Sequence, residues 1–385
     1  MQSLCIVRES NIERTPRVMQ MESIFDVPPR ELDALTWQVD LPLDDREWNI
    51  GLIVGPSGCG KSTIINEIFK NNIAGEFNWP EDKSVLDAFP PDMGIKDITT
   101  LLSSVGFSSP PAWIRPYHVL SMGEKFRVTM ARVLAENTDL AVVDEFTSVV
   151  DRTVAQIGSH AIAKTVRKRK QKFIAVTCHY DVMDWLQPDW IYCPVANSFE
   201  WRFLQPRPNI KVDIIRVRHT AWKIFQTAHY LSKDLHRAAR CFMMIWENRP
   251  VAFAGLMAFP HVHLKNAYRG HRLVCLPDYQ GVSIGAAMAD FCGAMLGGVG
   301  KSFYVRTAHP GEKARMFKSD NWRVINAPKP GTPVAMGQGI GNKKNKRVKR
   351  KNKRIYRPVA SAIYKGPIYP KDEAKRIWDD QPMEI

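Results

Sequence analysis

A glycine-rich turn between an apolar run and an amphipathic run constrains this chain more than any other stretch. The turn GPSGCGKS, residues 55–62, follows the apolar NIGLIVG and opens the segment STIINEIFK. Its three glycines let the backbone curl tightly, so that the N–H groups of the turn and the N-terminus of the following helix face an anion. The sequence therefore predicts a strand, a phosphate-binding loop and a helix, with the contacts made by Gly55, Pro56, Ser57, Gly58, Cys59, Gly60, Lys61, Ser62 and Thr63.

Two carboxylates at the end of a second apolar run complete the expected site. The run LAVVDEF, residues 140–146, has the composition of a buried strand and contains Asp144 and Glu145. Beside a phosphate-binding loop, Lys61 can pair with the β- and γ-phosphates of ATP, while Ser62 and Asp144 can ligate Mg²⁺. Glu145 can then activate the attacking water. We therefore expect ATP and Mg²⁺ as ligands and ATP hydrolysis as the reaction.

Further segments follow in the order found in ATP-binding-cassette (ABC) ATPases, which the chain resembles over about residues 25–200. LSMGE resembles the signature motif, FRVTMARVLA the helix behind it, SVVD the D-loop, and VTCHY the switch-histidine segment. The resemblance implies that Ser121 and Gly123 contact the γ-phosphate of ATP held by a second copy, and that His179 senses the phosphate in its own copy. With one loop and one signature per chain, it also implies a homodimer that ATP closes and hydrolysis releases.

The chain departs from the family pattern in several places. Only 58 residues separate the loop lysine from the signature, and none is a glutamine, so Asp87 or Asp92 could replace the family's Q-loop residue. The subdomain that docks on a transporter is therefore expected to be small or altered, and no transporter subunit is expected. Met122 and Glu124 replace a glycine and a glutamine. Trp37 is the candidate for stacking on adenine, with a plain core tryptophan as the alternative.

Length and composition predict a soluble, cytoplasmic protein of two domains and a tail. At 385 residues the chain exceeds the size at which one hydrophobic core keeps growing. Its longest apolar runs, such as VAFAGLMAF, fall far short of the ~20 residues that span a bilayer. The N-terminus lacks the apolar stretch of a secretory signal. The seven cysteines form no C-x-x-C pair, which fits reduced thiols.

Charge is divided unevenly along the chain. Residues 1–200 hold 20 Lys and Arg against 27 Asp and Glu, a net charge of −7, whereas residues 201–385 hold 34 against 12, a net charge of +22. The run KKNKRVKRKNKR, residues 343–354, has nine positive residues and no acid. Such a run stays extended and gains by displacing counterions from a polyphosphate. Nucleic acid is therefore the expected partner, and a solubility tail is the alternative.

A second small-residue turn lies in HRLVCLPDYQGVSIGAAMADFCGAML, which has the pattern of a strand, a turn and a helix. This segment resembles the acyl-CoA-binding core of the GNAT acetyltransferase superfamily. The Q/R-x-x-G-x-G/A pattern of that superfamily falls on Gln280, Ser283 and Gly285, with serine where glycine is usual. The resemblance covers about residues 210–328 and implies an acyl-CoA whose pyrophosphate lies on this turn, which also contains Gly281. Phage Mom proteins, which modify DNA bases, are relatives within that superfamily.

Catalytic groups of the second domain are less well defined. The superfamily often uses a tyrosine on the helix after the fifth strand, and the corresponding segment here, PGEKARMFKSDN, has none. His309 and Glu312 beside the start of that helix are candidates for the acid or base, with a helix cap or a solvated charge as the alternative. HVH, residues 261–263, places two imidazoles on one face of a strand, but no third metal ligand follows at a suitable spacing.

The expected fold class is α/β. A P-loop ABC-type nucleotide-binding domain is expected over residues 1–203, a GNAT-like mixed α/β domain over 210–328, and a basic, disordered C-terminal tail over 329–385. The expected function is ATP hydrolysis coupled to a GNAT-like transferase that acts on, or docks to, nucleic acid, with DNA base modification as one outcome. Two alternatives stay open: an ATP-gated nucleic-acid clamp with a noncatalytic second domain, and an acyltransferase acting on a protein or small molecule.

Overall fold

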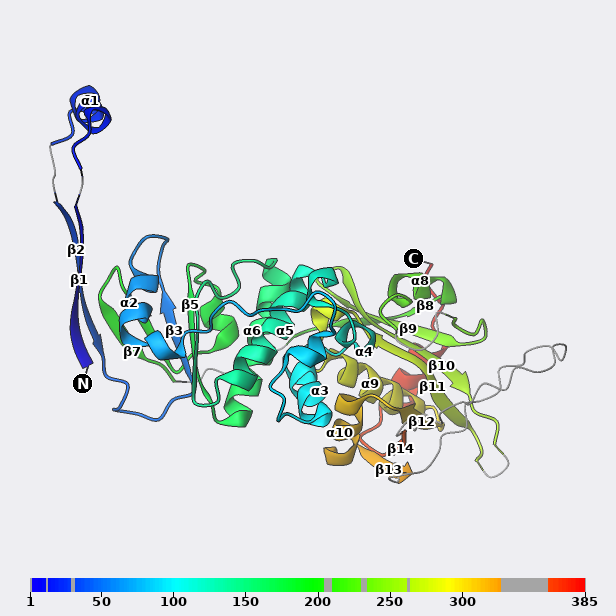
Figure 1. Ribbon diagram of the computed structural model, residues 1–385. Coiled ribbons are helices and arrows are strands. Elements are labelled where there is room, and N and C mark those ends of the chain that lie inside the picture. Colours follow the sequence, from blue (N-terminus) through cyan, green and yellow to red (C-terminus); the bar gives the residue numbers. More distant parts are fainter. Residues whose placement is uncertain are drawn as a thin grey trace, which may run out of the picture. The chain divides into compact units, whose positions relative to one another are not determined.

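The chain divides into two compact units, each built from two stretches of sequence (Figure 1). The first unit comprises Met1–Met93 and Ile114–Pro208, and the second unit comprises Gly94–Trp113 and Asn209–Ile385. The computed structural model describes residues 2–11, 13–28, 32–203, 210–229, 234–261, 264–326 and 359–384. Within these described ranges, no helix is long and apolar enough to cross a membrane.

The centre of the first unit is a five-stranded sheet in the order β4-β5-β3-β6-β7. The first four strands are parallel, and β7 runs antiparallel to β6. Strand β3 is buried along its whole length, as expected for an apolar strand in the middle of a parallel sheet. The strands are β3 (Ile50–Val54), β4 (Leu140–Val143), β5 (Lys172–Thr177), β6 (Trp190–Cys193) and β7 (Ser198–Trp201), and the main helices are α2 (Lys61–Ile68), α5 (Met122–Glu136), α6 (Arg152–Arg169) and α7 (Val182–Leu186).

A two-stranded antiparallel arm precedes this sheet in the first unit (Figure 1). Its elements are β1 (Gln2–Asn11), α1 (Pro16–Phe25) and β2 (Leu32–Leu41). Ile6 and Val39 anchor the arm because they join the hydrophobic cluster that also contains buried side chains of β3 and α2. This anchor brings Trp37 of β2 to the glycine-rich loop.

The second unit contains a seven-stranded sheet in the order β13-β14-β12-β11-β10-β9-β8. Neighbouring strands are antiparallel, except that β11 and β12 are parallel. Helix α9 connects β11 to β12, and α10 connects β12 to β13. The bounds are β8 (Asp213–Val217), α8 (Trp222–Phe225), β9 (Arg240–Trp246), β10 (Arg249–Ala258), β11 (Ala267–Cys275), α9 (Ile284–Gly298), β12 (Ser302–Thr307), α10 (Pro310–Lys318), β13 (Trp322–Asn326), β14 (Ala360–Tyr364) and α11 (Lys371–Asp379).

The one parallel pair in this described sheet is short. Ala267–Arg269 of β11 pair with Ser302–Tyr304 of β12. Strand β11 continues to Cys275 and β12 continues to Thr307 without further pairing between them. The two strands therefore share hydrogen bonds near their starts only, and each leads separately into the helix that follows it.

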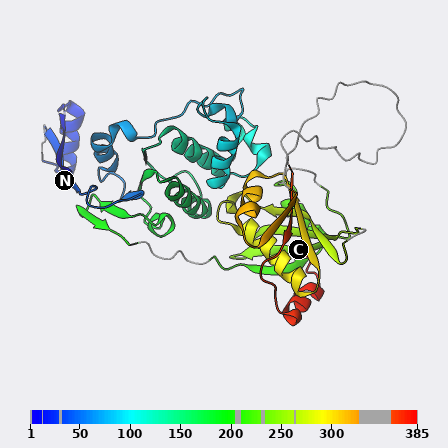
Figure 2. The ribbon, with the colours of Figure 1, turned by 90° about the horizontal axis from the view of Figure 1, so that it is seen from below.

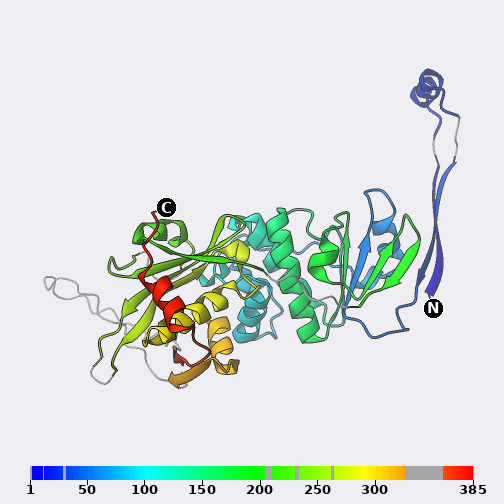
Figure 3. The same ribbon diagram turned by 180° about the vertical axis from the view of Figure 1, so that it is seen from behind.

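The prediction of a disordered tail over residues 329–385 is wrong for residues 360–379. Strand β14 lies between β12 and β13, and α11 packs against α9 (Figures 2 and 3). A short apolar run after the basic stretch is buried in this sheet, and its buried members are Ala360, Ala362 and Ile363. The basic run at 343–354 lies outside the described residues.

Residues 94–113 cluster with the second unit, although the chain places them between the phosphate-binding loop and the signature. They contain α3 (Ile95–Ser104) and α4 (Pro110–Trp113). The apolar face of α3 is buried through Ile98, Leu101 and Leu102. Helix α3 contacts α10, so this segment packs within the second unit.

Candidate functional site

The glycine-rich loop has the backbone geometry of a phosphate-binding turn. Gly58 and Gly60 have φ angles of 78° and 91°, in the left-handed region that glycine adopts at little cost. Gly60 directly precedes α2, which begins at Lys61. The first N–H groups of a helix have no partner within the helix and lie at the positive end of its dipole. The loop and the start of α2 therefore offer donors to an anion.

Trp37 of β2 supports this loop. Its indole Nε1 donates a hydrogen bond to the Cys59 carbonyl at 3.1 Å. A Cβ atom added at Gly60 would lie 2.4 Å from the indole ring, so the close approach of the ring requires glycine there as well as the positive φ. Trp37 is thus a supporting residue of the loop, and its proposed stacking on adenine stays a prediction.

The side chain of Lys61, the first residue of α2, folds back over the glycine-rich loop. Its Nζ donates to the carbonyl oxygens of Gly55 at 2.9 Å and Pro56 at 2.8 Å. The ammonium group is therefore held beside the donors of the turn, where it adds a full positive charge to their partial charges. This position suits the binding of a polyphosphate.

Ser62 and Asp144 meet across 82 residues of sequence. The Ser62 hydroxyl donates to Asp144 Oδ2 at 2.6 Å, and Asp144 Oδ1 accepts from the backbone N–H of Glu145 at 2.8 Å. The parallel sheet produces this meeting because β3 and β4 both lead to the same edge, where their carboxyl ends lie. Hydroxyl and carboxylate oxygens are ligands that Mg²⁺ prefers. The two residues predicted to hold the metal are thus adjacent.

A cavity of about 290 Å³ opens beside these groups. Exposed Glu145 is part of its wall, and its φ of 50° is unusual for a residue with a side chain. Backbone conformations of this kind cost energy and are common at functional sites. The wall is formed by Leu35, Trp37, Ser57, Gly58, Gly60, Lys61, Ser62, Thr63, Asp144, Glu145, Ser148, Thr177 and Cys178.

The signature segment begins helix α5. The Ser121 hydroxyl accepts from the backbone N–H of Glu124 at 3.3 Å, and Glu124 Oε2 accepts from the N–H of Ser121 at 2.9 Å. This reciprocal pair is a capping box, so Glu124, where the family has glutamine, caps the start of the helix. Ser121 and Met122 are exposed, and neither they nor Gly123 belong to the described wall of the cavity.

His179, Asp151 and the candidate Q-loop residues do not belong to the described wall of the cavity. His179 follows β5, and its backbone N–H donates to Thr177 Oγ1 at 3.1 Å, so it is adjacent in sequence to the cavity wall. Asp151 of the D-loop segment caps α6 by accepting from the N–H groups of its first turn. Neither Asp87 nor Asp92 belongs to the described wall, so the structure does not choose a Q-loop substitute.

The second turn repeats the backbone pattern of the first. Gly281 and Ser283 have φ angles of 99° and 71°, and α9 begins directly after Ser283. The side-chain amide of Gln280 is held by two hydrogen bonds. Its Oε1 accepts from the N–H of Ser108 at 2.9 Å, and its Nε2 donates to the carbonyl of Cys275 at 3.0 Å. A Cβ added at Gly285 would make only an ordinary contact, 3.5 Å from the Cβ of Cys275.

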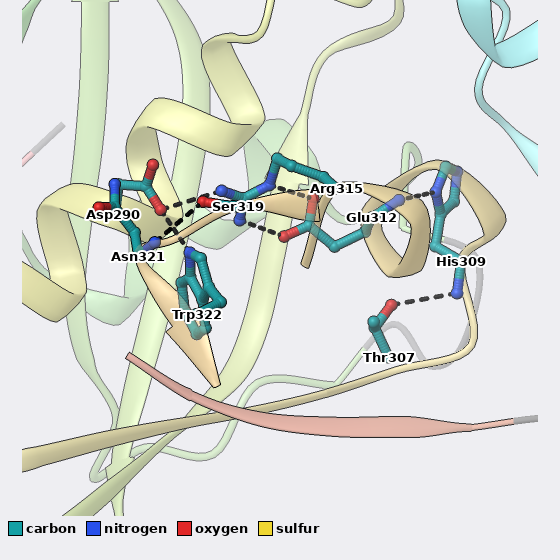
Figure 4. Close-up of polar contacts among 8 residues, drawn as sticks. All are labelled: Asp290, Thr307, His309, Glu312, Arg315, Ser319, Asn321 and Trp322. Atoms are coloured by element: carbon teal, nitrogen blue, oxygen red, sulfur yellow. Dashed lines mark hydrogen bonds and ion pairs between the residues drawn. The ribbon is translucent and has the colours of Figure 1, made fainter. Parts of the chain in front are cut away.

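His309 is a partly buried helix cap, which was the alternative to a catalytic role (Figure 4). Its Nδ1 accepts from the N–H of Glu312 at 3.4 Å, and its Nε2 lies 2.9 Å from the carbonyl oxygen of Ser108. Burial lowers the pKa of His309 below its ordinary value, and the backbone contact with Ser108 opposes this. With both ring nitrogens engaged, neutral His309 has a structural role in this arrangement. Of the HVH motif, only His261 lies within the described residues.

Glu312 belongs to an ion-pair network between α9 and α10 (Figure 4). Its Oε1 pairs with Arg315 at 2.6 Å, and the same guanidinium pairs with Asp290 at 2.9 Å. The Trp322 indole also donates to Asp290, at 2.6 Å. The sequence analysis missed Asp290 and Arg315, because their spacing along the chain gives no sign that two helices bring them together.

Comparisons with known proteins give relatives for part of the chain, although no protein-family model matches it. The methionine import ATP-binding protein MetN of Vibrio vulnificus (strain YJ016) is 28% identical over 210 residues, covering 43% of this chain and 58% of MetN. Elongation factor 3B of Saccharomyces cerevisiae (strain ATCC 204508 / S288c) is 27% identical over 150 residues, covering 33% of this chain and 14% of that protein. The dimeric structure of MJ0796, a bacterial ABC transporter cassette, has a TM-score of 0.33 at 15% identity, covering 42% of this chain and 88% of that chain.

This chain therefore spans less than two thirds of the length of either sequence relative. The similarity agrees with the geometry of the first unit, where the glycine-rich loop, Lys61, Ser62 and Asp144 surround one cavity. Together the relatives and the site support an ATP-binding-cassette ATPase domain, with a P-loop nucleotide-binding cassette, in this chain.

Proposed function

We propose that the first unit binds ATP with Mg²⁺ and hydrolyses it. The observation that carries this proposal is the 2.6 Å contact between Ser62 and Asp144, the two oxygen groups suited to a magnesium ion beside a phosphate-binding loop. When bound, Mg²⁺ supplies charge that polarises the phosphate oxygens. Lys61 binds the β- and γ-phosphates, and exposed Glu145 orients and deprotonates the attacking water.

A homodimer completes this site. Each chain has one phosphate-binding loop and one signature, and Ser121 and Gly123 are absent from the described wall of their own cavity. Exposed Ser121 and the start of α5, at the positive end of the helix dipole, form the second anion-binding surface of this proposal. In the proposed dimer this surface contacts the γ-phosphate of ATP in the partner subunit, and His179 senses that phosphate within its own subunit.

The first test replaces the proposed base. Glu145→Gln removes the proton acceptor and keeps the size of the side chain, so ATP turnover falls by about 10²–10⁴-fold while ATP still binds. The ATP-bound dimer then accumulates, which light scattering detects. Glu200→Gln, at an exposed position of β7, is the matched control and hydrolyses ATP at the wild-type rate. A Glu145→Gln protein with wild-type turnover contradicts the proposed role.

The second unit is proposed to be a GNAT-like transferase that uses an acyl-CoA. Its strand order, the short parallel pairing of β11 with β12, and the turn before α9 support this assignment. In the turn, positive φ angles at Gly281 and Ser283 precede a 15-residue helix, an arrangement that directs N–H groups at a phosphate. Gln280, Gly281, Ser283 and Gly285 are the residues proposed to contact the pyrophosphate of the acyl-CoA.

Nucleic acid is the proposed acceptor or docking surface, with DNA base modification as the specific reaction. The net charge of +22 over residues 201–385 supports a polyanionic partner. One sequence relative is named an elongation factor, and another is named an import protein, so the relatives alone favour no single acceptor.

An ATP-gated nucleic-acid clamp is the second candidate. The engagement of His309 as a helix cap and of Glu312 with Arg315 favours it, because neither candidate acid or base is free. In this version the second unit binds nucleic acid without transferring a group.

One experiment separates these candidates. Wild-type and Glu145→Gln proteins are incubated with ATP, labelled acetyl-CoA and duplex DNA, and dimerisation and label transfer are measured. Labelled DNA supports the transferase, whereas a trapped dimer on unlabelled DNA supports the clamp. Label on protein or on a small molecule supports a different acceptor, and DNA binding that does not weaken with salt contradicts both nucleic-acid versions.

A further inference from the structure

One residue between α3 and α4 contacts both the proposed acyl-CoA turn and the cap of α10. The Ser108 N–H donates to Gln280 Oε1 at 2.9 Å, and the Ser108 carbonyl oxygen lies 2.9 Å from His309 Nε2. Gln280 lies in the turn before α9, and His309 is the N-cap of α10. A segment that lies in the sequence between the phosphate-binding loop and the signature thus contacts the turn before α9.

Ser108 lies where the ends of β11 and β12 have separated. Gln280 lies five residues beyond the end of β11, and His309 lies two residues beyond the end of β12. At these points β11 and β12 no longer pair with each other. Ser108 therefore bridges the two chain segments that separate after the short parallel pairing.

The backbone groups of Ser108 resemble the amide groups of an acyl-CoA. A backbone N–H and a backbone carbonyl are the same donor and acceptor that the amide groups in the pantetheine arm of an acyl-CoA offer. Gln280 and His309 use one hydrogen-bonding atom each on Ser108. While these two bonds persist, the same atoms are not available to an acyl-CoA.

Aromatic side chains hold this segment in place. Phe107 and Trp113 are 2% and 4% exposed, and the Trp113 indole donates to the Phe107 carbonyl at 2.8 Å. The Trp113 and His309 rings lie 6.3 Å apart between centroids. The segment is therefore an anchored part of the second unit.

The same segment is joined to the first unit at both ends. Met93 precedes it and Ile114 follows it, and only seven residues separate Trp113 from Ser121 of the signature. A short stretch of chain therefore connects the signature to residues 106–113.

We propose that residues 106–113 are an internal gate on the acyl-CoA site, closed by Ser108 and opened when ATP binds to the first unit. This inference rests on the proposed acyl-CoA function of the second unit. Coupling between two binding sites is reciprocal, so CoA must raise the affinity for ATP by the same factor by which ATP raises the affinity for CoA.

Calorimetric titration of the full chain with CoA tests the gate, in the presence and absence of a non-hydrolysable ATP analogue with Mg²⁺. Phe107→Ala removes the anchor, and Ser108→Pro removes the N–H that Gln280 accepts. Without nucleotide, both variants are expected to bind CoA about 10-fold tighter than wild type. The analogue tightens CoA binding to wild type by a similar factor and has little effect on the variants. Phe89→Ala, a truncation of a similarly buried phenylalanine in the first unit, behaves as wild type.

Hydrogen exchange on the wild-type protein gives a readout that needs no substitution. The Ser108 amide is protected without nucleotide, because Gln280 accepts its hydrogen bond, and loses protection when the analogue binds. Equal CoA affinity in wild type and both variants, with no effect of the analogue, overturns the gate and leaves the proposed CoA site standing. If no protein binds CoA, the gate and the proposed CoA site both fail.

Discussion

The two helix-starting turns of this protein share a backbone shape and differ in chemistry. In the first unit, positive φ angles at Gly58 and Gly60 precede α2, and in the second unit, positive φ angles at Gly281 and Ser283 precede α9. Each turn thus has two left-handed residues separated by one residue, followed at once by a helix. This shape suits binding of a phosphate group in either unit.

The difference lies in the charged groups around each turn. The first turn has Lys61 over it and the contact between Ser62 and Asp144 beside it. The second turn has Gln280, whose amide is already bonded to Ser108 and Cys275. A turn with a cation and metal ligands can support phosphoryl transfer, whereas a turn with backbone donors alone can hold a phosphate without cleaving it. The same backbone shape therefore serves two proposed purposes.

Among changes at the two turns, the largest expected effect comes from removing the cation of the first turn. Lys61→Ala deletes a preorganised positive charge, so ATP hydrolysis falls by about 10²–10³-fold in a phosphate-release assay. Gln280→Ala, the corresponding change at the second turn, leaves the ATPase rate unchanged. Lys70→Ala, which removes an exposed lysine just after α2, controls for the loss of charge. Equal loss of ATPase activity in the Lys61 and Gln280 variants would break the comparison.

A smaller effect is expected from the support of the first turn. Trp37→Phe keeps an aromatic ring against Gly60 and removes the hydrogen bond to Cys59, which is worth about 1 kcal/mol. ATP affinity is expected to fall by about 5-fold, measured by fluorescence titration with a labelled ATP. Trp48→Phe removes a similar indole hydrogen bond, to Leu43, and serves as the control. Unchanged affinity in Trp37→Phe means that this bond does not hold the loop in shape.

The second unit is expected to lose stability in mild acid. Burial lowers the pKa of His309 and lowers that of His271 to about 4, both from an ordinary value of about 6.5. Below pH 6.5 the unfolded chain therefore binds more protons than the folded chain, so the free energy of unfolding falls as the pH decreases toward 4. Unfolding midpoints between pH 7.5 and 4.5 measure this, and His271→Gln or His309→Gln is expected to flatten the profile. A wild-type profile that rises toward acid contradicts the assignment of neutral imidazoles.

The smallest expected effect is at the serine that replaces glycine in the second turn. Ser283 has a φ of 71°, where a Cβ costs energy, so Ser283→Gly is expected to raise the free energy of unfolding by about 0.5–1 kcal/mol. Ser319→Gly, at a φ of −92°, lacks this strain and is expected to lose stability. Chemical denaturation measures both. A loss of stability in Ser283→Gly would show that the turn is not strained.

The sequence was sufficient for those features that depend on short segments. The strand, loop and helix around Gly60, and the carboxylates at the end of β4, follow from local pattern, because a parallel sheet brings its strand ends to one edge. The contact of Ser108 with Gln280 joins residues 172 positions apart, so no local hydrophobic pattern in the sequence could predict it. Strand β14 was missed because its five residues follow a long basic stretch, although they are apolar enough to be buried.

The central claim is that the two turns bind two different phosphate ligands. Calorimetry with an ATP analogue and with CoA tests it in the Phe107→Ala chain, where the proposed gate is removed. Gly60→Ala and Gly281→Ala each place a Cβ at a φ of more than 90°. The account predicts that Gly60→Ala loses the ATP analogue and keeps CoA, while Gly281→Ala loses CoA and keeps the analogue. Loss of both ligands in one variant, or of neither ligand in Gly281→Ala, would contradict it.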